Sequence, residues 1–284
     1  MNILVTGCQG QLGSELRDLE KSYPQYKFFF TDVKELDITQ EEKVQKFVKS
    51  NKIEVVINCA GYTAVDKAES DKSNATLLNA TAVKYLAQAS AKVNALLIHI
   101  STDYVFEGKS FKPYTENDTA SPKSIYGKTK LDGEIEVIFN AKRALIFRTS
   151  WLYSSHGKNF VKTIAEKGKT SPELKVVYDQ VGTPTYAGDL AKAILDIIPK
   201  VPSKIRTEIY NYSNEGVASW YDFAQAIADI KDLKCHIEPI PTKDFPTDAQ
   251  RPFYSILSKA RVKKDFGITI PHWRKSLEVC LGKI

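Results

Sequence analysis

The chain begins with MNILVTGCQGQLGSEL, residues 1–16, and this stretch decides the fold. An apolar run ends at Thr6, and Gly7, Gly10 and Gly13 follow at every third position. A strand that turns sharply into a helix favours glycine, which adopts backbone angles that other residues avoid. The amides of the helix N-terminus then face an anion such as a pyrophosphate. We therefore predict a nucleotide-cofactor loop. Gly7 makes its turn, Gly10 admits the phosphate and Gly13 lets the helix pack on the strand.

Further short apolar runs follow, separated by amphipathic segments of helical length. They are almost continuously apolar rather than alternating, which is typical of parallel strands buried on both faces. This alternation predicts an α/β fold, a Rossmann-type doubly wound parallel sheet covered by helices. The five predicted strands are 2–6, 27–31, 54–60, 95–101 and 144–150.

The regular alternation ends near residue 150, after which prolines divide the chain into shorter pieces. We therefore expect a smaller C-terminal α/β domain that holds the substrate. Residues 1–150 and 173–204 are assigned to the dinucleotide-binding domain, and residues 151–172 and 205–284 to the substrate domain.

Three helix starts are predicted from capping patterns. Thr39–Glu42 has the pattern of a capping box. Ser121-Pro122 offers an N-cap and a first-turn proline for the helix that carries Tyr126. Ser219–Asp222 is predicted to cap a helix that runs to about Ile230.

Composition narrows the class of protein. The 284 residues are 43% hydrophobic with a net charge of +6, and the basic residues are spread along the chain, which argues against nucleic-acid binding. No apolar run reaches the roughly 18 residues of a membrane span, and no signal peptide is recognised, so we expect a cytoplasmic protein without a membrane partner. Neither the cysteines nor the histidines have metal-ligand or disulfide-framework spacing, so we expect free thiols and no metal; these residues are Cys8, Cys59, Cys235, Cys280, His99, His156, His236 and His272.

Asp32 directly follows the second predicted strand. An acid at this place suits the hydroxyls of an adenine ribose and disfavours a 2′-phosphate, which favours NADH. Lys34, two residues on, softens that preference, so the predicted cofactor is NADH or NADPH. The alternative is that Asp32 is an ordinary turn acid.

Tyr126 and Lys130 lie four positions apart, which places them on one face of a helix. A tyrosine with its usual pKa near 10 is a poor acid or base at neutral pH, and a nearby ammonium lowers that pKa. Thr102 follows the fourth strand, at the strand end where α/β sheets bind ligands. The three residues together predict hydride transfer to or from a carbon–oxygen bond, with Tyr126 handling the proton. The alternative is that Tyr126 and Lys130 are simply two neighbouring side chains on the exposed surface of a helix, since this spacing alone is common.

Longer blocks extend these motifs over most of the chain. With T-G-x-x-G-x-x-G and Y-x-x-x-K, the sequence resembles the extended short-chain dehydrogenases/reductases, and the blocks narrow the resemblance to the dTDP-4-dehydrorhamnose reductase family. The blocks are TAVDKAE (63–69), LNAT (78–81), STDYVF (101–106), YGKTKLDGE (126–134), FRTSWLY (147–153), DQVGTPT (179–185) and QRPFYS (250–255).

The resemblance implies that NAD(P)H reduces the C4 ketone of dTDP-6-deoxy-L-lyxo-4-hexulose to give dTDP-L-rhamnose. It implies that Tyr126 donates the proton, that Lys130 tunes it and holds the ribose, and that Thr102 bonds the carbonyl. The implied cofactor-binding residues are Gly7, Gly10, Gln11, Leu12, Gly13, Asp32, Asp37, Ile38, Ala60, Gly61, Tyr62, Thr63 and Lys130.

For the dTDP-sugar, the resemblance implies contacts from Thr102, Tyr126, Asp103 and Trp151. Arg251, in the Arg-Pro block, suits a bidentate clamp on the diphosphate. The alternatives are a core aromatic at the domain junction for Trp151 and a surface arginine for Arg251.

Some members of the family are dimers bridged by magnesium through glutamates. Glu15 matches one such position, but Asp189 replaces the second and the tail lacks the third. Cys59 and Gly61-Tyr62 also depart from the family pattern, with no expected effect. We therefore expect no metal and a monomer or weak homodimer.

Two other functions are compatible with the sequence. The chain could be a 4-ketoreductase for another dTDP-deoxysugar, with the same fold and triad and a different pocket. It could also be a non-catalytic, reductase-like regulatory subunit of methionine adenosyltransferase, against which the intact Thr102, Tyr126 and Lys130 argue.

Overall fold

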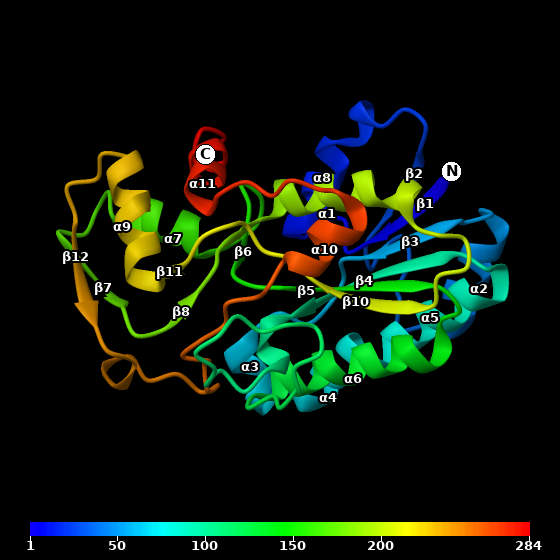
Figure 1. Cartoon of the computed structure of the whole chain (residues 1–284), viewed down its shortest axis with the longest axis horizontal. Coiled ribbons are helices and arrows are strands. Elements are labelled where there is room, and N and C mark those ends of the chain that lie inside the picture. The colour runs from blue at the N-terminus through cyan, green and yellow to red at the C-terminus, as the bar shows by residue number, and fades with distance from the viewer.

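The computed structural model describes all residues from 1 to 284. Its centre is a six-stranded sheet with helices on both faces, and a smaller α/β part lies beside it (Figure 1). The strand order is β10-β5-β4-β3-β1-β2, and all neighbours are parallel, which confirms the predicted doubly wound fold. The strands are β1 (Asn2–Thr6), β2 (Lys27–Thr31), β3 (Val55–Asn58), β4 (Leu96–Thr102), β5 (Ala144–Thr149) and β10 (Thr207–Asn211).

Each face of the sheet packs on its own group of helices, because successive strand side chains point to opposite faces. Ile3 and Val5 of β1 belong to the core shared with α1, α8 and α10, whereas Leu4 belongs to the core shared with α2, α5 and α6 (Figure 1). Both faces are therefore buried, as the continuous apolar strands predict. These helices are α1 (Gln11–Asp18), α8 (Ala187–Ile197), α10 (Ala260–Phe266), α2 (Glu41–Ser50), α5 (Ala82–Val93) and α6 (Ile125–Asn140).

The smaller part has its own core around Tyr153, Phe223 and Trp273. It contains the parallel pair β7 (Glu173–Val177) and β12 (His236–Ile240), together with helices α7, α9 and α11 (left side of Figure 1). Those helices are α7 (Phe160–Lys167), α9 (Trp220–Ile230) and α11 (Trp273–Leu281), and the short pairs are β6 (Leu152–Tyr153) with β9 (Thr185–Tyr186) and β8 (Val181–Gly182) with β11 (Ala218–Ser219).

The remaining elements are single turns and short helices along the connections. They are α3 (Val65–Ser70), α4 (Lys72–Thr76), the π-helical turn η2 (Leu77–Thr81) and the 3-10 turns η1 (Glu20–Ser22), η3 (Asp103–Val105), η4 (Ile198–Lys200) and η5 (Thr242–Asp244).

The two parts are not divided at the expected residues. β10, at 207–211, is the edge strand beside β5, although it was assigned to the substrate domain. β7, at 173–177, pairs with β12 in the smaller part, although it was assigned to the dinucleotide-binding domain. Helix α10 also packs on the sheet through Val262 and Phe266. The chain passes between the two parts several times, and these pairings join segments far apart in sequence.

Two of the three predicted helix starts are wrong. Helix α2 begins after Gln40 without a side-chain cap, because the Thr39 hydroxyl instead donates to the Asp37 carboxylate. Helix α6 is capped by Ser124, whose hydroxyl accepts from the Gly127 amide, and not by Ser121. The capping box of Ser219 with Asp222 at the start of α9 is confirmed.

No helix is both long and apolar enough to cross a bilayer. The four cysteines are free, as expected.

Candidate active site

A cavity of about 1080 Å³ opens at the carboxyl ends of the parallel strands and extends over the smaller part. Residues from both parts line it, which matches the general placement of ligands in α/β sheets. Every predicted site residue lines the cavity except Gly13 and Tyr62; the others are Gly7, Gly10, Gln11, Leu12, Asp32, Asp37, Ile38, Ala60, Gly61, Thr63, Thr102, Asp103, Tyr126, Lys130, Trp151 and Arg251.

The glycine loop has the geometry of a phosphate cradle. Gly7 has a φ of +64°, and a Cβ there would lie 2.7 Å from the backbone of Ala60. A Cβ on Gly13 would lie 2.4 Å from the carbonyl oxygen of Gly7, so a glycine here lets α1 pack closely against the loop. No side chain caps α1 at Gly10, which leaves its first amides open toward the cavity. The loop therefore fits an anionic ligand such as a pyrophosphate.

The carboxylate of Asp32 lies at the end of β2, on the cavity wall. It accepts hydrogen bonds from the amides of Gln9 (3.1 Å) and Val33 (2.9 Å), which fix its direction. Asp37 is held within its own turn, and the hydrogen bond from the Thr39 hydroxyl lowers the pKa of Asp37.

Tyr62, the other residue outside the cavity, directs its phenol to Asp71, at 3.0 Å. Its backbone is held by Asn79, whose side-chain oxygen accepts from the Tyr62 amide at 2.8 Å. Tyr62 therefore shapes the segment after β3 and does not present its side chain to the cavity.

Thr102, Tyr126 and Lys130 all line the cavity. Thr102 ends β4, whereas Tyr126 and Lys130 belong to the first turns of α6. Gly127 brings α6 close, because a Cβ there would lie 2.2 Å from the Tyr104 carbonyl oxygen. The Lys130 ammonium donates to the carbonyl oxygen of Ile100 at 2.5 Å.

The pKa of Tyr126 shifts in the direction opposite to the prediction. Burial raises the pKa of this phenol, and only the hydrogen bond with Thr102 lowers it. Lys130 is not among the groups that shift it. The Lys130 ammonium donates to the Ile100 carbonyl, and burial lowers the pKa of Lys130 to about 8. Tyr126 is thus a neutral phenol at neutral pH, the protonation state that a proton donor needs.

Asp103 is buried beside this triad, with 2% of its surface exposed. Its Oδ1 accepts from the Thr102 hydroxyl at 3.0 Å, whereas its Oδ2 has no hydrogen-bond partner. Burial raises the pKa of Asp103 to about 7, against the lowering effect of hydrogen bonds from Thr102 and Ser255. A buried carboxyl group with a raised pKa therefore lines the cavity.

Trp151 forms an aromatic wall with two residues that the sequence does not single out. Its ring stacks on Trp220 with centroids 3.6 Å apart, and Phe160 lies 4.7 Å beyond Trp220. Trp151 has a φ of +47°, a strained value for a bulky residue. Gly182 makes room for it, because a Cβ there would lie 2.8 Å from the indole. Trp151 is thus both a cavity residue and a packed aromatic where the two parts meet.

Arg251 is a half-buried residue that lines the cavity and has two side-chain partners. Its guanidinium forms an ion pair with Asp66 at 2.6 Å and donates to the Tyr104 hydroxyl at 3.2 Å. Asp66 also accepts from the backbone amide of Ala249 at 3.2 Å. Arg251 is therefore not a free surface arginine, and Asp66 holds the loop that carries it.

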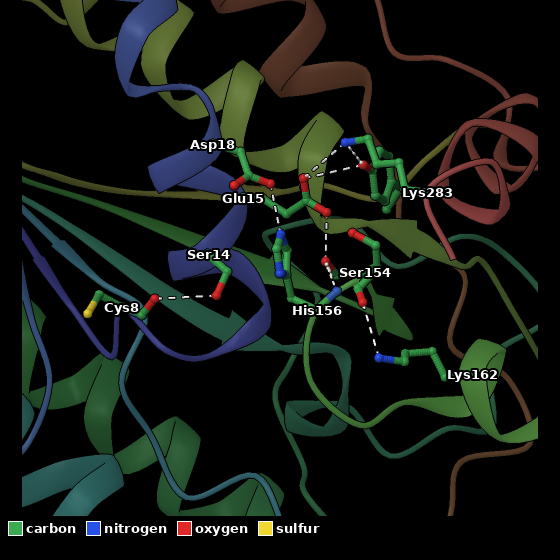
Figure 2. A network of polar contacts seen from close by, with 10 residues as sticks. Cys8, Ser14, Glu15, Asp18, Ser154, His156, Lys162 and Lys283 are labelled. Atoms are coloured by element: carbon green, nitrogen blue, oxygen red, sulfur yellow. Dashed lines mark hydrogen bonds and ion pairs between the residues drawn. The ribbon is translucent and has the colours of Figure 1, made fainter.

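Glu15, which matches one magnesium ligand in the family pattern, lies in a network of polar contacts between α1, the smaller part and the C-terminal tail (Figure 2). Its buried carboxylate accepts from the Ser154 hydroxyl at 2.6 Å and lies 3.6 Å from the Lys283 ammonium. His156 contacts Asp18 at 2.8 Å next to it, and the ligand atoms of Glu15, Asp18 and His156 lie within 4.8 Å of one another. Lys283 thus supplies a positive charge to Glu15 from within the chain.

Asp189, the residue at the second magnesium position, lies in other contacts. Its carboxylate accepts from the Asn214 amide at 2.7 Å and from the Ser276 hydroxyl at 2.5 Å. These bonds fasten α8 to the segment after β10 and to the first turn of α11.

Known proteins of one family are similar to this chain over its whole length. The family of the RmlD substrate binding domain matches residues 1–284. The chain is 39% identical to the dTDP-4-dehydrorhamnose reductase of Aggregatibacter actinomycetemcomitans, over 97% of each protein. It is 37% identical to a probable dTDP-4,6-dihydroxy-2-methyloxan-3-one 4-ketoreductase of Streptomyces antibioticus, over 98% of this chain and 93% of that one.

Among solved structures, the dTDP-4-dehydrorhamnose reductase of Bacillus anthracis in complex with NADP has a TM-score of 0.95 and 37% identity. The match covers 100% of this chain and 99% of that one. The full-length matches confirm the resemblance seen in the sequence motifs. The chain therefore belongs to the family of the RmlD substrate binding domain.

Proposed function

We propose that this chain is an NAD(P)H-dependent dTDP-4-dehydrorhamnose reductase. It reduces the C4 ketone of dTDP-6-deoxy-L-lyxo-4-hexulose and forms dTDP-L-rhamnose. The observation that carries the proposal is that Thr102, Tyr126 and Lys130 line one large cavity together with Gly7 and Gly10 of the glycine loop.

The sheet domain holds the cofactor in this proposal. The glycine loop and the N-terminus of α1 bind the pyrophosphate, Asp32 bonds the adenine ribose, and Lys130 bonds the ribose of the nicotinamide. The bound cofactor supplies the hydride. Two features of the glycine loop support pyrophosphate binding: the positive φ of Gly7 and the start of α1 at Gly10, which no side chain caps.

Tyr126 is the proton donor. Its phenol is neutral at neutral pH because burial raises its pKa, so it gives its proton to the ketone oxygen as negative charge develops there. Thr102 is the neighbour that lowers the pKa of the phenol. Exclusion of water from this buried wall strengthens both interactions.

The smaller part holds the dTDP-sugar. Trp151 packs on the face of the sugar, Asp103 bonds a sugar hydroxyl, and Arg251 bonds the diphosphate with the donors that Asp66 and Tyr104 leave free. The cytoplasmic location, the monomer or weak homodimer, and the absence of nucleic-acid and membrane partners stay predictions.

A second candidate shares the chemistry and differs in the sugar. The match to the probable 4-ketoreductase of Streptomyces antibioticus favours a 4-ketoreductase of another dTDP-deoxysugar. The non-catalytic regulatory function has no such support, since the triad is intact and assembled.

A coupled assay tests the proposal. dTDP-glucose is converted by a 4,6-dehydratase and a 3,5-epimerase, and the purified chain is then added with NADPH or NADH. We expect cofactor oxidation and formation of dTDP-L-rhamnose. Another dTDP-sugar as the product would favour the second candidate, and no oxidation with either cofactor would contradict the enzyme assignment.

A further inference from the structure

The loop of residues 154–159 connects the two parts of the molecule beside the cavity. It leads from β6 into α7, whose residues Val161 and Ile164 belong to the core of the smaller part. It also contacts α1, whose residues Leu12 and Leu16 belong to a core of the sheet. The loop therefore touches one helix of each part, and its contacts help to fix how the two parts meet.

The contacts of this loop lie along one face of α1. Gln11, the first residue of the helix, is followed by Glu15 and Asp18 at the spacing of a single helix face. Glu15 accepts from the Ser154 hydroxyl at 2.6 Å, and Asp18 contacts His156 at 2.8 Å (Figure 2). Gln11 makes the third contact, and of these three helix residues only Gln11 lines the cavity.

Asn159 is the partner of Gln11. Its side-chain nitrogen donates to Oε1 of Gln11 at 2.9 Å, and also to the backbone oxygens of Ser154 at 2.7 Å and His156 at 3.3 Å. Its side-chain oxygen accepts from the Lys162 amide at 3.1 Å, so the same residue is the N-cap of α7. One side chain therefore holds both the start of α7 and the side chain of Gln11.

Both ends of this network lie at proposed ligand sites. Gln11 directly follows Gly10 of the glycine loop, where the proposed function places the pyrophosphate. On the other side, the face of α7 that lines the cavity begins directly after Asn159. The residues of this face are Phe160, Thr163, Ile164 and Lys167. Phe160 is also part of the aromatic wall, with its ring centroid 4.7 Å from that of Trp220.

We propose that Asn159 is a positioning residue that holds the cavity face of α7 against the cofactor loop through Gln11, an inference that rests on the proposed reductase function. A bound dinucleotide fixes the N-terminus of α1, and Asn159 extends this effect to the wall that contacts the nucleotide-sugar. The two ligands therefore strengthen each other's binding, by the same factor in both directions. Without the bond between Asn159 and Gln11, each ligand binds its own part of the molecule independently.

The test is the affinity of the chain for dTDP, measured by isothermal titration calorimetry with and without saturating NADP+. Wild type is expected to bind dTDP about fivefold more tightly when NADP+ is present, the factor that one net hydrogen bond is worth. Asn159→Ser keeps a good N-cap for α7, but its side chain is shorter and has no amide to donate to Gln11. This variant is expected to bind dTDP equally well with and without NADP+.

His156→Ala is the matched control. It removes another contact between this loop and α1, but the side chains of His156 and Asp18 are exposed and lie outside the cavity. The variant is therefore expected to keep the effect of NADP+ on dTDP binding. Loss of the effect in His156→Ala as well as in Asn159→Ser would mean that any loosening of the loop abolishes it, which would overturn the specific role of Asn159.

Gln11→Met removes the same hydrogen bond from the side of α1, and it replaces Asn159→Ser if circular dichroism shows that the latter does not fold. It too is expected to lose the effect of NADP+ on dTDP binding. An effect that persists in either variant, or that is absent from wild type, would overturn the positioning role.

The titrations need no turnover, so they separate this inference from the reductase assay. A chain in which NADP+ strengthens dTDP binding but which oxidises no NADPH would lose the proposed reductase chemistry and keep the positioning role of Asn159. An active reductase without the effect would keep the chemistry and lose the positioning role. A chain that does not bind dTDP at all would contradict both.

Discussion

The ammonium of Lys130 donates a 2.5 Å hydrogen bond to the backbone carbonyl of Ile100. This bond joins α6 to β4 two residues before Thr102, and so fixes the distance between Tyr126 on the helix and Thr102 on the strand. A buried ammonium with a single backbone acceptor keeps donors free for a ribose. The same lysine therefore has a positioning role in the chain and a binding role in the proposed mechanism.

Tyr126→Phe is expected to lower kcat by at least about 100-fold while the Kd for NADPH stays close to that of wild type. The change removes only the phenolic proton donor and keeps the ring that packs on Tyr104. Steady-state kinetics and fluorescence titration with NADPH measure the two quantities. Turnover near the wild-type rate would show that another group donates the proton.

Asp32→Ala is expected to raise the ratio of kcat/KM for NADPH to that for NADH. The carboxylate is oriented at the cavity wall by the amides of Gln9 and Val33, where it repels a 2′-phosphate. Parallel assays with the two cofactors measure the ratio. An unchanged ratio would place the adenine ribose away from Asp32.

Arg251→Lys is expected to raise the KM for the dTDP-sugar by about tenfold with little change in kcat, because lysine keeps the charge and loses the planar fork. Asp66→Asn is the control. It weakens the ion pair that holds Arg251 and leaves the guanidinium in place, so the KM is expected to change less. Equal effects of the two substitutions would mean that Arg251 only fastens its loop to α3.

Lys283→Met is expected to lower the free energy of unfolding by about 1–2 kcal/mol, because it leaves the buried carboxylate of Glu15 without its cation. Lys234→Met is the matched control, since Lys234 pairs with Asp232 where both side chains are more than four-fifths exposed. That change is expected to stay within about 0.5 kcal/mol. Urea denaturation measures both variants, and equal effects would show that the Glu15 network in Figure 2 does not depend on Lys283.

The elements that could be predicted from sequence are those encoded locally. The five strands with continuous apolar runs were found within one or two residues of their ends, and Ser219 caps α9 as its spacing predicts. β10 was missed as a sheet strand, because TEIYN is short, partly polar and joins β5 after a long excursion through the smaller part. Such pairings depend on contacts between distant segments, which local patterns do not record.

In the candidate site too, some residues could be predicted from local sequence and others could not. Gly7, Gly10, Tyr126 and Lys130 were predicted from motif spacing and Thr102 from its place after a strand, and all five line one cavity, whereas Gly13 does not. Trp220 and Asp66 were missed, because each acquires its place through a distant partner, Trp151 in one case and Arg251 in the other. The direction of the Tyr126 pKa shift was also wrong, since burial cannot be read from a Tyr–Lys spacing.

The central claim is hydride transfer from a nicotinamide to C4 of a dTDP-linked sugar, and isotope labelling tests it most directly. The chain is incubated with the dTDP-4-keto sugar and NADPH carrying deuterium at the transferable C4 position of its nicotinamide, and the product is analysed by NMR. The account predicts dTDP-L-rhamnose with deuterium at C4 from one of the two cofactor stereoisomers, and none with Tyr126→Phe at the same time point. A product without deuterium at C4 from either stereoisomer, or no product at all, would contradict it.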